Sequence, residues 1–161
     1  MYQETFNLQA ELLKALSHPK RLEIIHLLRN QTLSVSQIQQ MLDLPQANLS
    51  QHLAVLRENE VVASTKEGKQ IFYKLAHKNF IKASDLIRQV LIERYHDYPM
   101  VDELTLKMKD LVPVVHDLVC KMRLSPKTAS YAYKYQNKNY YFCASGCLSK
   151  FKKNPKKFIK N

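Results

Sequence analysis

The segment Asn48-Leu49-Ser50-Gln51-His52-Leu53-Ala54-Val55-Leu56-Arg57-Glu58 decides the fold of this chain. Its leucines at positions 49, 53 and 56 recur at the spacing of one face of an α-helix, and polar side chains occupy the opposite face. We therefore expect a helix over residues 46–58 that packs through its leucines and presents its polar side chains outward.

Shorter helices are expected on the N-terminal side of this segment. A helix that opens at Ser34 or Ser36 is ended by Leu44-Pro45, and two earlier helices are expected over residues 5–16 and 19–29. Two short helices joined by a tight turn, the second with a polar outer face, are typical of a helix-turn-helix.

A β-hairpin is expected directly after the helix-turn-helix. The segments 61–66 and 70–75 are rich in strand-forming residues, and Glu67-Gly68 lies between them. Gly68 provides the positive φ that the turn requires. This hairpin is the wing of a winged helix.

A further helix is expected over residues 79–96, with an apolar stripe at Ile87, Val90, Leu91 and Tyr95. A three-helix core closes without this stripe. We therefore interpret the helices at 5–16 and 79–96 as a homodimer surface.

The chain divides at His96-Asp97-Tyr98-Pro99, where the helical pattern stops. We predict a DNA-binding and dimerisation domain over residues 1–96, a connecting segment over 97–113 with a helix near 101–112, and a small module over 114–161. The predicted class is mainly α with small β elements (α+β).

Charge and composition restrict the function. The net charge of +11 is uneven, with 12 Lys and Arg against 10 Asp and Glu up to residue 99, and 13 against 4 beyond it. A basic excess indicates an anionic partner, commonly nucleic acid, although a lysine-rich end can also be only a solvated face. No apolar run approaches the ~20 residues that span a bilayer. We see no signal peptide, and expect a cytoplasmic protein with reduced cysteines.

The segments 16–25 (LSHPKRLEII) and 48–58 together resemble the ArsR/SmtB family of winged-helix repressors, over roughly residues 5–96. The resemblance implies a homodimer that binds a palindromic operator in double-stranded DNA and releases it when an inducer binds. In such dimers the half-sites lie roughly 34–36 Å apart.

Eight polar side chains are the predicted DNA contacts. On the helix, side chains that can reach base edges are Gln46, Asn48 and Gln51. Those suited to phosphates or to orienting the helix are Ser50, His52 and Arg57. At the wing tip, Lys66 and Lys69 are suited to the DNA backbone or the minor groove. The alternative is a winged helix used for protein contacts, with this face merely solvated.

The inducer site is expected in the C-terminal part, because neither the helix at 35–42 nor the helix at 79–96 carries the family's metal-site patterns. The segments 116–122 (HDLVCKM), 139–147 (NYYFCASGC) and 151–158 resemble the YHS/TRASH domain, over about residues 114–160. That resemblance implies a treble-clef-like module associated with heavy-metal trafficking, resistance and sensing.

Cys120, Cys143 and Cys147 are the predicted metal ligands. A helix starting near Cys143 would place the last two sulfurs on one face, and its terminal amides would stabilise thiolates. Three thiolates suit soft ions, with Cu(I) favoured and Zn(II), Hg(II) or As(III) also compatible. A fourth ligand is open between Met122, His116 and none. The same cysteines can instead form a thiol-redox or persulfide sensor, or be only small buried hydrophobes.

Together these features predict a metal-responsive DNA-binding transcriptional regulator that acts as a repressor. The competing hypotheses are a thiol-redox regulator with the same cysteines, and a metal carrier or enzyme-associated module that bears a winged helix. An enzyme is not expected, because the sequence shows no acid/base pair and no phosphate-cradling glycine loop.

Overall fold

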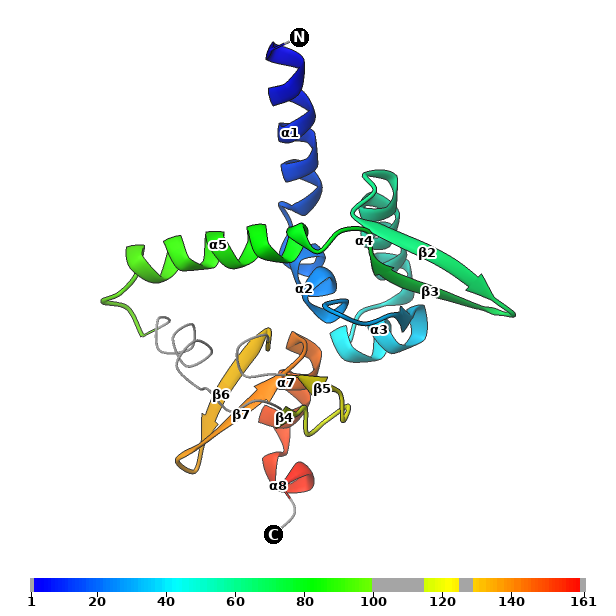
Figure 1. Cartoon of the computed structure of the whole chain (residues 1–161). Helices are drawn as coiled ribbons and strands as arrows, with labels where there is room; N and C mark the ends of the chain where they lie inside the picture. Colours follow the sequence, from blue (N-terminus) through cyan, green and yellow to red (C-terminus); the bar gives the residue numbers. More distant parts are fainter. Residues whose placement is uncertain (1, 100–114, 125–128, 160–161) are drawn as a thin grey trace.

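The computed structural model describes residues 2–99, 115–124 and 129–159 (Figure 1). The N-terminal part contains helices α1 to α5 and a small three-stranded sheet. The elements are α1 (Tyr2–Leu16), α2 (Pro19–Leu27), β1 (Leu33–Ser34), α3 (Val35–Leu42), α4 (Gln46–Glu58), β2 (Val62–Glu67), β3 (Gln70–Leu75) and α5 (Asn79–Arg94).

The helix-turn-helix consists of α3 and α4. Ser34 and Gln37 form a capping box at the start of α3, and Asp43 ends the helix in the left-handed region with φ +54°. The leucines at 49, 53 and 56 of α4 are at most 2% exposed and join the core. The predicted bounds of α4, 46–58, agree with the structure.

The wing is the hairpin of β2 and β3, and the sheet has the antiparallel order β1-β3-β2. Gly68 has a φ of +59° at its tip, as the sequence predicts. In Figure 1 this hairpin extends away from the helices, beside α4. The fold class is therefore the expected winged helix within an α+β chain.

Helices α1 and α5 project from the body of the molecule (Figure 1). α1 begins earlier than the predicted residue 5, and α5 ends at Arg94, before the predicted residue 96. Apolar side chains are exposed along both helices. On α1 they are Tyr2, Phe6, Leu8 and Leu13, and on α5 they are Leu86, Ile87, Val90 and Leu91.

The C-terminal module consists of two small hairpins and two helices. These elements are β4 (Val115–His116), β5 (Arg123–Leu124), β6 (Tyr131–Tyr135), β7 (Lys138–Phe142), α7 (Ser145–Lys153) and α8 (Pro155–Phe158). The ring of Phe151 is fully buried against the rings of Tyr140 and Phe142, with centroids 5.1 and 5.0 Å away. The helix predicted near 101–112 lies outside the described residues.

One hydrophobic cluster runs through both parts of the chain. It joins core leucines of the winged helix to Phe142, Cys143, Cys147 and Phe151 of the module, and α7 packs against α3. Within the described part of the chain, no helix is both long and apolar enough to span a bilayer.

Candidate functional site

The first part of the cysteine site is the loop from Asp117 to Met122, between β4 and β5. Two backbone hydrogen bonds close it: Asp117 N donates to Met122 O at 2.9 Å, and Lys121 N donates to Asp117 O at 2.8 Å. Lys121 lies in the left-handed region with φ +64°. The carboxylate Oδ1 of Asp117 accepts the amides of Val119 at 2.8 Å and Cys120 at 3.4 Å, so the side chain shapes its own loop.

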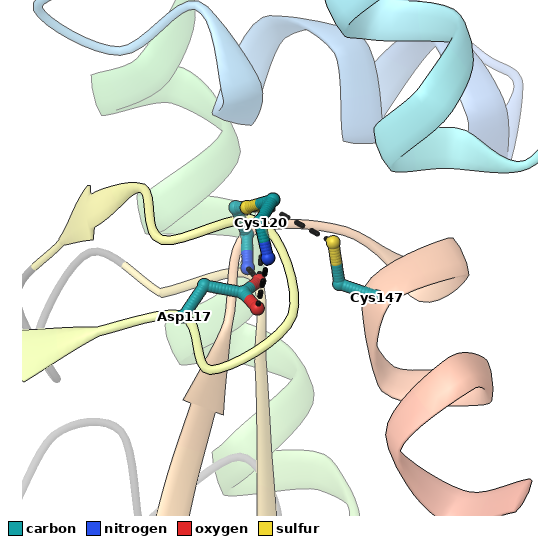
Figure 2. A group of neighbouring side chains, drawn as sticks. Asp117, Cys120 and Cys147 are labelled. Carbon is teal, nitrogen blue, oxygen red and sulfur yellow. Dashed lines mark hydrogen bonds between the residues drawn. The ribbon is translucent and has the colours of Figure 1, made fainter. Parts of the chain in front are cut away.

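The second part is the junction of β7 and α7. α7 begins at Ser145, so Cys143 precedes the helix, whereas the sequence suggested a helix starting near Cys143. Cys143 is bound instead by Asp117, whose Oδ2 accepts its backbone amide at 2.9 Å and its thiol at 3.1 Å. One buried carboxylate thus holds both cysteine-bearing segments together. Figure 2 shows Asp117 and Cys120 on their loop, facing Cys147 on α7.

The three cysteines and Asp117 form one compact group. The Sγ atoms of Cys120 and Cys143 are 3.5 Å apart, and those of Cys143 and Cys147 are 3.7 Å apart. All four ligand atoms lie within 4.8 Å of one another. A tetrahedral ion with metal–sulfur bonds of about 2.3 Å needs sulfur–sulfur separations of about 3.8 Å. The donor set therefore fits an ion of this size, with three sulfurs and one oxygen.

The ionisable groups of the site can carry only negative charge. Hydrogen bonds from the thiols of Cys143 and Cys147 hold the pKa of Cys120 well below its usual range. The contact with Cys120 and burial raise the pKa of both Cys143 and Cys147. Burial, and then the charge of Cys120, raise the pKa of Asp117. A thiolate at Cys120 thus faces a buried carboxyl group, an arrangement that a cation stabilises.

No ion pair among the described residues involves Asp117. The sequence interpretation did not include this residue as a ligand. An Asp three positions before a Cys, able to accept the amides that follow it, is the local signal that would have indicated it.

The two fourth ligands that the sequence offered, His116 and Met122, have different surroundings in the structure. His116 is exposed on β4 and outside the group of four. The thioether of Met122 accepts a hydrogen bond from Gln31 Nε2 at 2.9 Å, so this residue contacts the winged helix.

The second functional region is the outer face of α4. A groove of about 690 Å³ runs between α3, α4 and the wing. Of the predicted DNA contacts, four line it: Gln46, Ser50, Arg57 and Lys69. Ser36, Gln39 and Gln70 also line it and were not among the predicted contacts, although their polar character on α3 and β3 was visible in the sequence.

The remaining predicted contacts lie outside this groove. Asn48, Gln51 and Lys66 are exposed. His52 is half-buried, and its ring lies against that of His18 with centroids 4.4 Å apart. Burial lowers the pKa of His52, as do the charges of His18, Arg21 and Lys20. The neutral form of His52 is therefore favoured, and its ring packs α4 against the start of α2.

These features define the class of the protein: a winged helix-turn-helix chain with a small cysteine-bearing module. Residues 18–64 match the bacterial regulatory protein, arsR family, and residues 115–161 match the YHS domain. The chain belongs to the arsR family and carries a YHS domain at its C-terminal end.

Curated relatives resemble the winged-helix part. The biofilm growth-associated repressors of Agrobacterium fabrum and Xylella fastidiosa are 46% and 42% identical to it over 78 residues, or 48% of this chain. These matches span 64% and 66% of the repressors' own lengths, slightly less than two thirds.

Solved structures of bacterial regulators also resemble this chain over little more than half of its length. The transcriptional repressor BigR from Xylella fastidiosa superposes with a TM-score of 0.50 at 35% identity, covering 55% of this chain and 91% of that one. Rv0081 of Mycobacterium tuberculosis superposes with a TM-score of 0.52 at 35% identity, covering 58% of this chain and 94% of that one.

The conformation of Lys121 generates a prediction on stability. A side chain in the left-handed region is strained, and glycine relieves that strain at some cost in unfolded-state entropy. We expect Lys121→Gly to raise the free energy of unfolding by about 0.5–1 kcal/mol, measured by urea denaturation with reductant and chelator present. Lys138→Gly, in the extended strand β7, is the control and should lower it. Equal losses in both variants would contradict the argument.

Proposed function

We propose that this protein is a homodimeric operator-binding repressor whose affinity for DNA is set by a thiophilic metal ion held at Asp117, Cys120, Cys143 and Cys147. The observation that carries the proposal is the compact Cys3Asp group. Asp117, Cys143 and Cys147 are buried, Cys120 is partly buried, and Asp117 has no ion-pair partner among the described residues. Repressors among its relatives support the role on DNA and support a non-enzymatic protein. Such a role places the protein in the cytoplasm.

The DNA-facing surface is proposed to be the groove between α3, α4 and the wing. Gln46 and Ser50 lie on the same side of α4 as Arg57, and Lys69 completes the surface at the wing tip. Amide side chains at Gln46, Asn48 and Gln51 suit adenine edges, whereas Arg57, Lys66 and Lys69 suit phosphates.

The dimer is proposed to form through α1 and α5. The apolar side chains exposed on these two helices would be costly to leave in water, and both helices stand away from the body of the molecule (Figure 1). A second copy of this chain offers a matching apolar surface across a twofold axis.

The metal is proposed to be a soft or borderline ion. Three sulfurs alone suit Cu(I), whereas all four donors suit Zn(II). When bound, the ion supplies positive charge that stabilises the thiolates and the buried carboxylate. Asp117 positions both cysteine segments for this through its bonds to Cys120 N and Cys143 N.

A second function, redox sensing, is favoured by one distance. The Sγ atoms of Cys120 and Cys143 are 3.5 Å apart, close enough to form a disulfide after a small movement. A peroxide would accept the two electrons and leave as water while both thiols lose their protons.

The decisive experiment measures operator affinity as a function of metal. A duplex selected from random sequences by the full chain is titrated with reduced, chelator-treated protein, alone and with Cu(I), Zn(II), Hg(II) or As(III). We expect at least one ion to weaken binding by about 5- to 150-fold. Cys147→Ser and Asp117→Asn should weaken metal binding, whereas Asp97→Asn, at an exposed carboxylate, should not.

Unchanged DNA binding with every ion would contradict metal sensing. Release by peroxide or polysulfide with chelator present would support the redox function instead. Failure to select any DNA sequence would contradict the repressor itself.

The wing lysine generates a prediction on salt dependence. Lys69→Gln removes one phosphate contact per subunit, so affinity should fall for all sequences alike and the salt slope should decrease by about 1 per subunit. Lys138→Gln, exposed on β7, should change neither quantity. A loss confined to the selected sequence would instead assign Lys69 to a base edge.

The exposed face of α5 generates a prediction on assembly. Val90→Lys places a charge in the proposed interface, so we expect sedimentation to show a shift from dimer to monomer and a loss of operator binding. Gln89→Lys adds the same charge at the neighbouring exposed position and should leave the dimer intact. An unchanged dimer in Val90→Lys would exclude this surface.

A further inference from the structure

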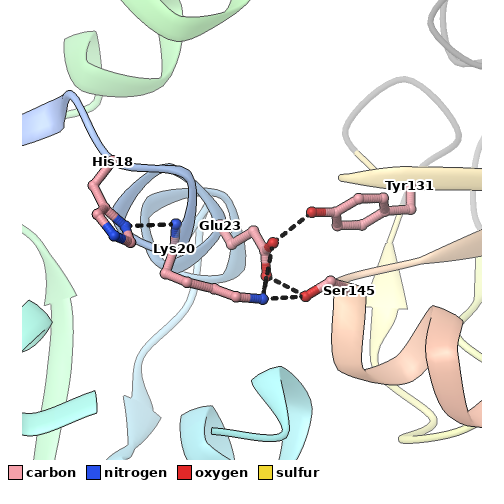
Figure 3. A network of polar contacts seen from close by, with 5 residues as sticks. All are labelled: His18, Lys20, Glu23, Tyr131 and Ser145. Carbon is pink, nitrogen blue, oxygen red and sulfur yellow. Dashed lines mark hydrogen bonds and ion pairs between the residues drawn. The ribbon is translucent and has the colours of Figure 1, made fainter. Parts of the chain in front are cut away.

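A buried carboxylate joins the winged helix to the cysteine module. Glu23 of α2 is 8% exposed, and its Oε1 accepts the hydroxyl of Tyr131 at 2.6 Å while its Oε2 accepts the hydroxyl of Ser145 at 2.6 Å. Lys20 Nζ donates to both carboxylate oxygens at 3.2 Å and to Ser145 Oγ at 2.6 Å. Figure 3 shows these side chains meeting between α2 and the module.

The position of Ser145 links this network to the cysteines. Ser145 is the first residue of α7 and lies midway along the chain between Cys143 and Cys147. Any change in the separation of the Cα atoms of those two cysteines involves its backbone. The residue that donates its hydroxyl to Glu23 is therefore also the residue that lies between two of the proposed metal ligands in the chain.

Gly146 forms a second contact at the same place. A Cβ built on Gly146 would lie 2.2 Å from Met41 O, 2.7 Å from Leu42 C and 2.8 Å from Asp43 N. The first turn of α7 thus rests directly on the backbone where α3 ends and the helix-turn-helix turns. This contact leaves no room for α7 to move closer to α3 unless α3 also moves.

Two flanking contacts hold the module against the same region. Gln31 donates to the thioether of Met122, two residues beyond Cys120, and Lys150 Nζ donates to Gln40 O of α3 at 3.2 Å. The module is therefore seated on α3 and on the loop that follows α2, next to the helix-turn-helix.

We propose that Glu23 is the positioning residue that couples the cysteine group to the DNA-binding helices, through its hydrogen bonds to Ser145 and Tyr131. The inference rests on the proposed function and assigns its route of regulation. In the arrangement described here the bonds to Glu23 are intact and hold the start of α7 against α2. Binding of an ion by Cys143 and Cys147 draws Ser145 from Glu23. The end of α3 follows α7, because Lys150 is bonded to Gln40 and both helices share one apolar core.

The test measures the coupling factor, which is the ratio of operator affinity without and with the active metal ion. Ser145→Ala, Tyr131→Phe and Glu23→Gln should each lower this factor at least threefold, toward 1. Metal affinity in the absence of DNA, measured by chelator competition on the full chain, should change less than threefold. The matched controls are Ser149→Ala, one turn further along α7, and Tyr98→Phe, an exposed tyrosine; both should keep the wild-type factor.

A double-mutant comparison separates coupling from a merely structural role. If both groups act through one contact, Glu23→Gln combined with Ser145→Ala should lower the coupling factor no more than the stronger single variant. Additive losses would overturn the assignment, and so would wild-type coupling in both Ser145→Ala and Tyr131→Phe, even if Glu23→Gln fails to fold. Absence of any metal response in the wild type would instead contradict the proposed function on which this inference rests.

Discussion

The close approach of Gly146 to the backbone at the end of α3 is the constraint on which the arrangement of this protein depends. Any other residue at position 146 would bring a Cβ within 2.2 Å of Met41 O. Because α7 can lie this close, Cys147 and Phe151 join the cluster that holds the core of the winged helix. The cysteine module is thereby built onto the helix-turn-helix, although a connecting segment separates the two along the chain.

Asp117 determines the arrangement of the cysteine site, as Gly146 determines the placement of α7. Its four hydrogen bonds fasten the loop of Cys120 to the segment of Cys143, so these two segments are held together by the chain itself. A buried carboxyl group beside a thiolate is unfavourable without positive charge. The interactions that shape the pocket therefore favour the cation that we propose, and the surrounding sulfurs favour a thiophilic one.

Local patterns in the sequence predicted the elements well and the contacts between them poorly. The leucine spacing of α4 and the glycine at position 68 specify their structures within a few residues, so helix, wing and turn were predictable. The bonds from Glu23 to Tyr131 and Ser145 span 108 and 122 positions. No local pattern specifies such pairs, since they arise only when α7 packs on α3. The three sulfurs were predictable from their spacing, whereas Asp117 required the folded loop.

The shared core also determines how a small ligand can act on DNA binding. Ligand that binds only the folded state stabilises the whole cooperative unit, which alone would leave α4 unmoved. A change in operator affinity requires two arrangements that the ligand distinguishes. The polar contacts of Glu23 and the tight packing at Gly146 supply such a pair, because a hydrogen-bonded, close-packed interface is either engaged or separated. In the proposed coupling, the buried carboxylate is the contact through which a local change at two cysteines displaces α3.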